Sequence, residues 1–241
     1  YVVNVSFSGR CRIGAFNKTH ILAGMPGHAG IYNARVHNCI IDNDAYIANI
    51  TGHIANYHIE DSVIIENAGI IAVTGKSAFG NGTSVPVMNE AGGREVKIYD
   101  NLSSHLAAVY TLFRSRCEVI KKLDHMINTY ASEKSSELGR IQKGAVIAGV
   151  QSMLNVNVGP YAGIEYATSL INGTINSCFE HPAFVGPGVV ASNFILASGA
   201  TLSDSARVKN CFIGEAANVS SGFSAENCLI FANCELANGE A

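Results

Sequence analysis

The sequence predicts an all-β solenoid, a left-handed parallel β-helix of about 17 residues per coil, interrupted by an α-helical insertion. Three observations support this fold class. A short pattern recurs at fixed spacing, as in SNFILASGATL, KNCFIGEAANV and ENCLIFANCEL. Gly, Asn and Ala are plentiful, Trp is absent and only 15% of residues are charged, which favours a tightly stacked backbone. The pattern disappears between residues 75 and 137, where apolar residues take a helical spacing.

The repeat is defined by three positions that follow an anchor residue. A large apolar residue stands at the third position, a small residue at the seventh and an aliphatic residue at the ninth. The frames that obey this rule have the anchors Asn4, Asn38, Asp61, Leu138, Asn155, Asn176, Asn193, Asn210 and Asn227. Such spacing is typical of the hexapeptide pattern of a triangular β-helix, in which stacked coils share one core. Asn at the corners tolerates positive φ and can bond to the Asn of the next coil.

The repeat spacing divides one continuous domain into three segments. Residues 1–74 and 138–241 are predicted to form coils, and residues 75–137 a glycine-rich loop followed by a helical insertion. The last frame needs residues beyond Ala241, so we expect the solenoid to be incomplete at its C-terminal end.

A helical stripe runs through the second half of the insertion. Its members recur three, four or seven residues apart and are Leu106, Val109, Phe113, Ile120, Leu123, Ile127 and Tyr130. We expect this face to pack against the β-helix, and the alternative is a seam between copies in a homo-oligomer. Charged residues are concentrated between residues 90 and 143, which makes this segment the first place to look for polar chemistry.

Composition argues against several classes of protein. The net charge of −3 does not suggest a nucleic-acid or anionic-membrane partner, and no apolar run reaches the length of about 18 residues that a transmembrane helix needs. The seven cysteines lack metal-type C-x-x-C spacing and favour a reducing, cytoplasmic compartment. Five of them fall at packed positions of the repeat, where we expect no metal: Cys11, Cys39, Cys211, Cys228 and Cys234.

The segment from Gly75 to Glu95 is the first candidate for ligand binding. Its GKS triplet is not a P-loop, because the preceding glycine is one residue out of place. The predicted substrate-binding side chains are Lys76, Asn89, Glu90, Arg94 and Glu95. They offer an amide, carboxylates and cations for a phosphate or carboxylate, next to glycines that let the backbone approach a ligand. The alternative is a salt-bridged loop that fastens the insertion to the coils.

Two histidine patterns are candidates for catalysis. His181, in FEHPAFV, is expected at a coil corner. The repeat resembles that of the hexapeptide acyltransferases, and this resemblance implies that His181 acts as general base toward a sugar hydroxyl or amine. The alternative is a solvated corner residue. His53 and His58, with a third imidazole from His20 or His37, would suit a zinc ion that activates water. This histidine spacing is similar to that of the gamma-class carbonic anhydrases.

The frames that carry N-S-x-F/V-I and N-C-x-I-G resemble the hexapeptide domains of sugar-nucleotide pyrophosphorylases and acyltransferases. Over its whole length the chain resembles a family of hexapeptide-repeat proteins from Bacteroidetes, a domain of unknown function. The stretches that carry this second resemblance are KSAFGNGTSVPVMNEAGGREVKIYD, GTINSC and the terminal NGEA. The resemblance to the hexapeptide enzymes implies acyl or nucleotidyl transfer to a sugar, sugar phosphate or nucleotide sugar, with acyl-CoA as the cofactor in the acyl case. A non-catalytic scaffold is the first alternative and the zinc enzyme the second.

Overall fold

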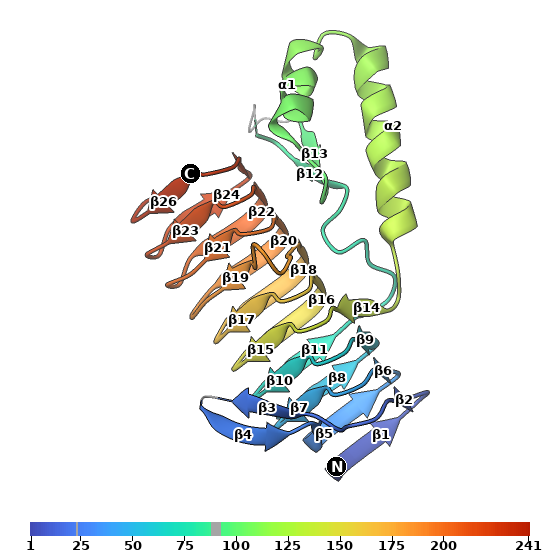
Figure 1. The fold of residues 1–241 in the computed structure, drawn as a ribbon. Helices are drawn as coiled ribbons and strands as arrows, with labels where there is room; N and C mark the ends of the chain where they lie inside the picture. Colours follow the sequence, from blue (N-terminus) through green and yellow to red (C-terminus); the bar gives the residue numbers. More distant parts are fainter. Residues whose placement is uncertain (23, 88–92) are drawn as a thin grey trace.

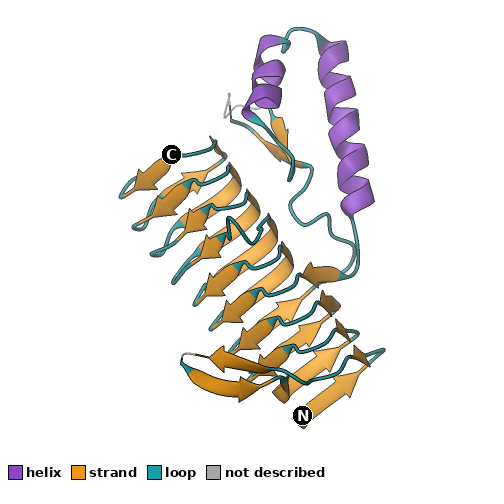
Figure 2. Ribbon diagram, viewed as in Figure 1, coloured by secondary structure: helices purple, strands orange, loops and turns teal. Residues whose placement is uncertain are grey.

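The computed structural model describes residues 1–22, 24–87 and 93–241, which form a parallel β-helix with one lateral insertion (Figure 1). In these residues one 22-stranded parallel sheet winds through the solenoid, and two small antiparallel hairpins and two helices complete the fold. Figure 2 shows that both helices lie in the insertion. The predicted solenoid is therefore confirmed. None of the helices in the described part of the chain is long and apolar enough to cross a bilayer.

Each coil contributes strands to three faces. The strands of the sheet are β1 (Val2–Ser8), β2 (Arg12–Ile13), β5 (Gly30–His37), β6 (Ile40–Ile41), β7 (Tyr46–Ala48), β8 (His53–Ala55), β9 (Tyr57–Ile59), β10 (Ile64–Glu66), β11 (Ile70–Ala72), β14 (Gly139–Ile141), β15 (Val146–Ala148), β16 (Ser152–Val158), β17 (Gly163–Glu165), β18 (Ser169–Ile175), β19 (Phe184–Val185), β20 (Val190–Leu196), β21 (Thr201–Leu202), β22 (Arg207–Ile213), β23 (Asn218–Ser220), β24 (Ser224–Glu226), β25 (Leu229–Ile230) and β26 (Glu235–Ala237). Several of them, such as β16, bend at a corner and serve two faces. The first face contains β7, β10, β15, β17, β19, β21, β23 and β26, and the second contains β8, β11, the first halves of β16, β18, β20 and β22, and β24. The third face, which carries the site, consists of β2, β6, β9, β14, the second halves of β16, β18, β20 and β22, and β25.

The interior is a stack of aliphatic columns. On the third face the inward column is Ile41, Ile59, Ile141, Val158, Ile175, Leu196, Ile213 and Ile230, all of them buried. Fully burying one such side chain contributes roughly 1.5–3 kcal/mol, so stacking supplies the stability that a single coil lacks.

Asparagines at the corners confirm the predicted ladders. Asn172, Asn193, Asn210 and Asn227 have φ between 50° and 57°, a left-handed conformation that Asn tolerates. Each of the first three donates its amide to the Asn of the next coil at 2.8–2.9 Å. A second ladder joins Asn4, Asn33, Asn49 and Asn67 at another corner.

Three of the predicted repeat frames are out of register with the others. Asn4 stands at the corner between the first and second faces, whereas Asn210 stands between the second and third, so the Asn4 frame is displaced by one side. The Asp61 frame is displaced by one side in the opposite direction, because Asp61 stands between the third and first faces and the residue equivalent to Asn210 in that coil is Asn56. Asn56 does not fit the repeat rule, because Val63 occupies the position at which a small residue is expected. In the Asn176 frame the corner residue is Asn172, and Phe179 lies in an exposed loop.

The insertion leaves the solenoid after β11, and β9 pairs directly with β14 across the gap. It contains the antiparallel hairpin of β12 (Thr83–Val85) and β13 (Val96–Ile98), then α1 (Ser104–Leu112) and α2 (Cys117–Lys134). Ser103 caps α1 by accepting a hydrogen bond from the Leu106 amide at 3.2 Å. The second hairpin, of β3 (Thr19–Leu22) and β4 (Met25–His28), adjoins the first coils.

The helical stripe packs on the solenoid only in part, through Leu106, which contacts the cluster that contains Ile195 and Phe212. Its buried member Ile127 joins Tyr110 of α1 and Val96 of the hairpin in a small core. Val85 and Ile98, which lie on the same side of the hairpin as Val96, pack on Ile195 and Phe212 of the third face. One apolar side of the hairpin thus contributes to both clusters, and Lys97 on its other side donates to Asn128 of α2 at 2.7 Å. Phe113, just beyond α1, is 40% exposed.

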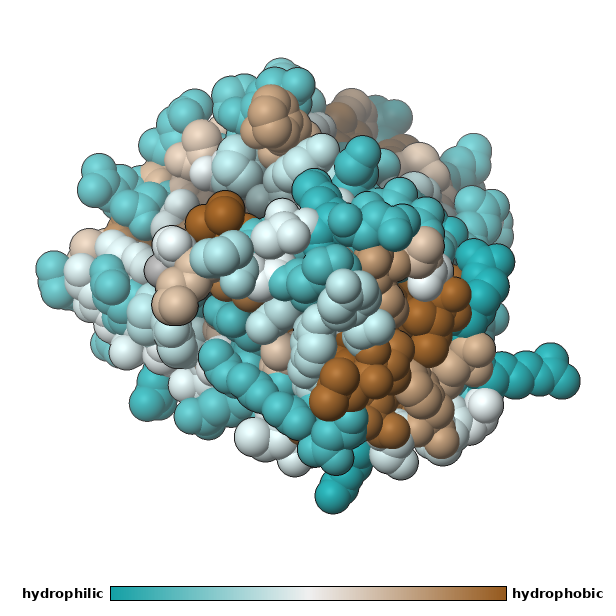
Figure 3. All heavy atoms as spheres, turned by 60° about the horizontal axis from the view of Figure 1, so that its bottom comes forward, coloured by the Kyte–Doolittle hydropathy of each residue, from teal (hydrophilic) through white to brown (hydrophobic). Residues whose placement is uncertain are grey.

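The N-terminal coil carries exposed apolar side chains. Figure 3 brings this end of the molecule forward and shows apolar surface in brown. The large hydrophobic residues exposed on this coil include Tyr1, Val2, Val3, Phe7 and Ile13.

Cys211 and Cys228 occupy the same column in neighbouring coils. From this arrangement we expect the Cys228 thiol to be more reactive than an ordinary thiol at neutral pH. The neighbouring Cys211 thiol is the main cause of a lowered pKa at Cys228, because it stabilises the thiolate. We expect alkylation of Cys228 by iodoacetamide to reach half its maximal rate at a pH below the ordinary thiol pKa of about 8.5. In Cys211→Ala the midpoint should rise toward the ordinary value of about 8.5. Fragmentation mass spectrometry would measure each site, with the exposed Cys234 as internal reference, and an unchanged midpoint in Cys211→Ala would contradict the interpretation.

Candidate functional site

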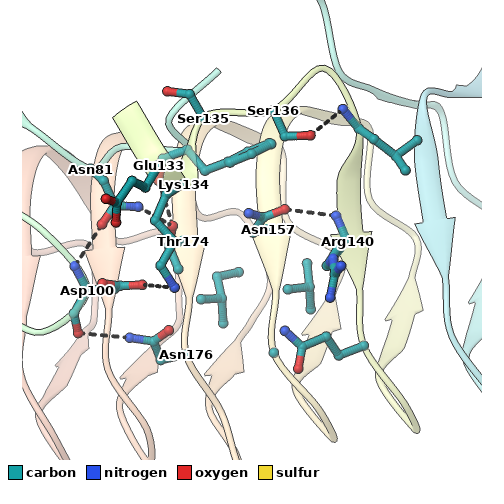
Figure 4. Close-up of a pocket in the computed structure, with 16 residues that line it drawn as sticks. Asn81, Asp100, Glu133, Lys134, Ser135, Ser136, Arg140, Asn157, Thr174 and Asn176 are labelled. Atoms are coloured by element: carbon teal, nitrogen blue, oxygen red, sulfur yellow. Dashed lines mark hydrogen bonds and ion pairs between the residues drawn. The ribbon is translucent and has the colours of Figure 1, made fainter. Parts of the chain in front are cut away.

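A polar cleft lies where the insertion meets the third face of the solenoid. It has a volume of about 510 Å³, within the range of small-molecule sites. Its floor is formed by outward side chains of three successive coils, Arg140, Asn157 and Thr174, and by Gln142 and Asn176 at the adjoining corner. Its wall comes from both linkers of the insertion and from the end of α2. Figure 4 shows these side chains converging from the two sides.

The floor is part of an outward column whose chemistry changes along the solenoid. In order the column reads Arg12, Ile40, His58, Arg140, Asn157, Thr174, Ile195, Phe212 and Leu229. The hairpin covers the apolar part, where Ile195 and Phe212 are buried against Val85, Ile98 and Leu102. The cleft therefore occupies the polar part of the column that the hairpin leaves uncovered.

Hydrogen bonds hold the wall against the floor. Asn81 donates to Thr174 Oγ1 at 3.3 Å and accepts from the Asp100 amide at 2.8 Å. Thr174 in turn donates to the Phe79 carbonyl at 2.6 Å. Asn81 and Thr174 are each only 7% exposed, so their polar atoms are fixed before any ligand arrives.

Asp100 is the centre of the charged network in the cleft. Its carboxylate accepts a hydrogen bond from the Tyr130 hydroxyl and lies 3.6 Å from Lys134 Nζ. Its side chain is 11% exposed, whereas that of Lys134 is 49% exposed. The Asn176 side-chain amide donates a hydrogen bond to the Asp100 backbone carbonyl at 3.2 Å. Burial and the bond to Asp100 raise the pKa of Tyr130, so the phenol remains a donor at neutral pH.

This arrangement suits a ligand rich in hydroxyl groups. Amides of Asn157, Asn176 and Gln142 can each donate and accept, and Asp100 supplies a fixed carboxylate that can accept a proton. Among the residues that the structure describes, no group of three or more His, Cys, Asp or Glu side chains is arranged to hold a metal ion.

The residues predicted from the glycine-rich segment lie outside this cleft. Lys76 is exposed in the linker that precedes the hairpin, and Arg94 is exposed at the opposite end of the hairpin, next to β13. Asn89 and Glu90 lie outside the described residues. The structure therefore does not bring Lys76 together with Arg94 and Glu95, because the length of the hairpin separates them.

Glu95 and Arg114 form a fastening contact inside the insertion. Arg114 donates to the carbonyls of Gly93 at 2.7 Å and Glu95 at 3.0 Å, and it lies 3.9 Å from the Glu95 carboxylate. A hydrogen bond from the Gly93 amide is the main cause of a lowered pKa at Glu95. This geometry favours the alternative of a salt-bridged loop, although Arg114 fastens the described residues of the loop within the insertion.

His181 stands apart from the cleft. It is exposed in the loop after β18 and lines a separate shallow cavity of about 430 Å³ with Cys178, Ser198 and Glu215. Its carbonyl accepts a hydrogen bond from Cys178 Sγ at 3.8 Å. The structure gives this imidazole no contact with Asp100 or Lys134 among the described residues.

The histidines considered for zinc have separate partners. His58 Nε2 lies 2.7 Å from Asp42, and His37 Nδ1 lies 2.8 Å from Ser8 Oγ. His20 Nε2 lies 2.7 Å from the Asp44 carbonyl, and His53 is exposed. In the described part of the chain these imidazoles do not converge.

The sequence held a partial signal for the cleft residues that were missed. Asp100, Lys134 and Arg140 all fall in the charge-rich segment 90–143, and Asn176 is one of the predicted repeat anchors. Nothing in the repeat indicates that these residues meet, since the insertion must first fold back over coils that follow it in the chain.

Comparison with known proteins finds a family match over the whole chain. Residues 1–241 match the family described as a domain of unknown function, DUF4954. A Treponema pallidum (strain Nichols) protein with the name "Uncharacterized protein" is 24% identical over 214 residues, which cover 81% of this chain and 29% of that protein. The chain thus spans less than a third of the length of this relative. Because the match includes every coil and the insertion that together build the cleft, the chain belongs to the DUF4954 family.

Proposed function

We propose that this chain is a hexapeptide-repeat transferase that binds a sugar, sugar phosphate or nucleotide sugar in the cleft between the insertion and the third face. The single observation that carries the proposal is the buried Asp100 network in a cleft lined by amide side chains. Carbohydrate hydroxyls need paired donors and acceptors, which Asn157, Asn176 and Gln142 provide. This assignment replaces the Gly75 to Glu95 segment as the binding site.

Asp100 is the general base in this proposal, in place of His181. A sugar hydroxyl next to its carboxylate would transfer its proton to an Asp100 oxygen as the hydroxyl oxygen bonds to the acyl carbon or phosphorus of the second substrate. The leaving group departs with the electrons of the bond that breaks. Tyr130 and Lys134 orient the carboxylate, and the low exposure of Asp100 excludes most water. The chemistry is the same for acyl and nucleotidyl donors, and an acyl-CoA would be the cofactor in the acyl case.

Ligand screening would test the proposal. We expect hexoses, hexose phosphates or nucleotide sugars to raise the melting temperature, since a ligand at 100 times its Kd adds about 2.7 kcal/mol of stability. Asp100→Asn should remove the ligand-induced rise, measured against the melting temperature of the free variant. Asp204→Asn is the matched control, because Asp204 is exposed at a distant coil corner. No response across the panel would favour the non-catalytic scaffold.

A further inference from the structure

The floor of the cleft contains an arginine that the protein leaves uncompensated. The Arg140 backbone amide donates to Asn157 Oδ1 at 2.8 Å, which fixes this position on β14. Its side chain is exposed and, among the residues that the structure describes, forms no ion pair. By contrast, Lys134 in the same cleft is paired with Asp100. Arg140 therefore supplies the cation with which a ligand can pair.

The position of Arg140 relative to the other charges is defined by the strands. Figure 4 shows Arg140 beside Asn157 at one end of the cleft, with Asp100, Glu133 and Lys134 at the other end. In the preceding coil its register partner is His58, which is bonded to Asp42, and Asp42 also lies 3.5 Å from Arg12. The nearby Asp42 carboxylate is thus shared by the Arg12 guanidinium and the His58 imidazole, and the Glu60 carboxylate accepts from the Lys143 amide.

We infer that Arg140 forms an oxyanion subsite that holds the phosphate of a phosphorylated sugar whose hydroxyls lie between Asn157 and Asp100. A planar guanidinium on a rigid strand can donate two parallel hydrogen bonds to phosphate oxygens. The carboxylates at the other end disfavour a second anion there and favour hydroxyl or amino groups. This inference rests on the proposed function and narrows its substrate class to anionic sugars, because a neutral sugar would leave the guanidinium unpaired.

Calorimetric titration with matched ligands tests the subsite. The probes are hexose 1-phosphates, the corresponding neutral hexoses, a nucleotide sugar and inorganic phosphate. We expect Arg140→Gln to weaken binding of the hexose 1-phosphate about 10- to 100-fold, as the loss of hydrogen bonds to a charged group predicts. The affinity for the neutral hexose should stay within about twofold. Arg140→Lys should retain part of the preference for the hexose 1-phosphate over the neutral hexose, since lysine keeps the positive charge but cannot donate two parallel hydrogen bonds.

The control variant is Arg207→Gln, which removes an exposed arginine on the second face and should change neither affinity. Equal weakening of phosphorylated and neutral hexose by Arg140→Gln would overturn the subsite, as would an unchanged affinity for the phosphate. In either case Asp100-dependent binding would leave the proposed function standing. If Arg140→Gln leaves the affinity for inorganic phosphate unchanged, the anion binds elsewhere and the subsite is likewise overturned. If none of the probes binds, both proposals are overturned.

Discussion

Phe194→Ala should lower the free energy of unfolding by about 3–5 kcal/mol. The Phe194 ring lies inside the solenoid with no exposure to solvent, in the same core as the aliphatic columns. A Cβ placed on Gly173 of the preceding coil would lie 2.3 Å from Cε1 of this ring, so the ring fills the space that the glycine leaves. The stacked coils cannot collapse into the resulting cavity without breaking their ladders. Urea denaturation, followed by circular dichroism and fluorescence, would measure the loss.

Two further variants make this stability experiment specific. Phe179→Ala removes an equally large ring that is 71% exposed and touches Tyr161 edge-on, so we expect a loss below about 1 kcal/mol. Gly173→Ala should be severely destabilising alone but should recover part of the lost stability when it is combined with Phe194→Ala, because the added methyl then enters the cavity. Equal losses in Phe194→Ala and Phe179→Ala would show that the Phe194 ring is not part of the core.

Ile195→Asp should release the insertion and abolish ligand binding while the coils remain folded. Ile195 is fully buried between the third face and the hairpin, where an unpaired carboxylate would cost about 3–5 kcal/mol. That cost falls on the docking of the hairpin, because the Ile195 side chain points away from the core of the solenoid. Once the hairpin is undocked, Asn81 and Asp100 no longer face Asn157 and Asn176.

Limited proteolysis and hydrogen exchange would measure this release. We expect cleavage within residues 75–137 to accelerate strongly, with unchanged protection of the strands β7 and β15. Val190→Asp, on the same strand but 39% exposed on the second face, is the matched control and should leave both the insertion and ligand binding intact. Global unfolding of Ile195→Asp would show that the hairpin is needed for the coils themselves.

The repeat could be predicted from the sequence because it is a local property. Ile213, Leu196 and Ile230 must point inward in any stack with this spacing, and the Asn ladder follows from positive φ at a repeated corner. The exceptions have local causes as well. Val63 stands where the repeat rule requires a small residue, so the rule predicts the anchor Asp61 in place of Asn56. The exposed loop around Phe179 adds residues to another coil, so the rule predicts the anchor Asn176 in place of Asn172.

By itself the amino-acid sequence determined the solenoid, its corner asparagines and the existence of a helical insertion, since each depends on residues close together in the chain. Only the tertiary structure decided where a ligand can bind. Asp100 and Arg140 are separated by both helices in sequence, and Thr174 and Asn176 follow two coils later. They meet because the hairpin packs on apolar side chains of the third face, above all Ile195 and Phe212. This contact joins residues that are far apart in the chain, so the repeat spacing cannot predict it.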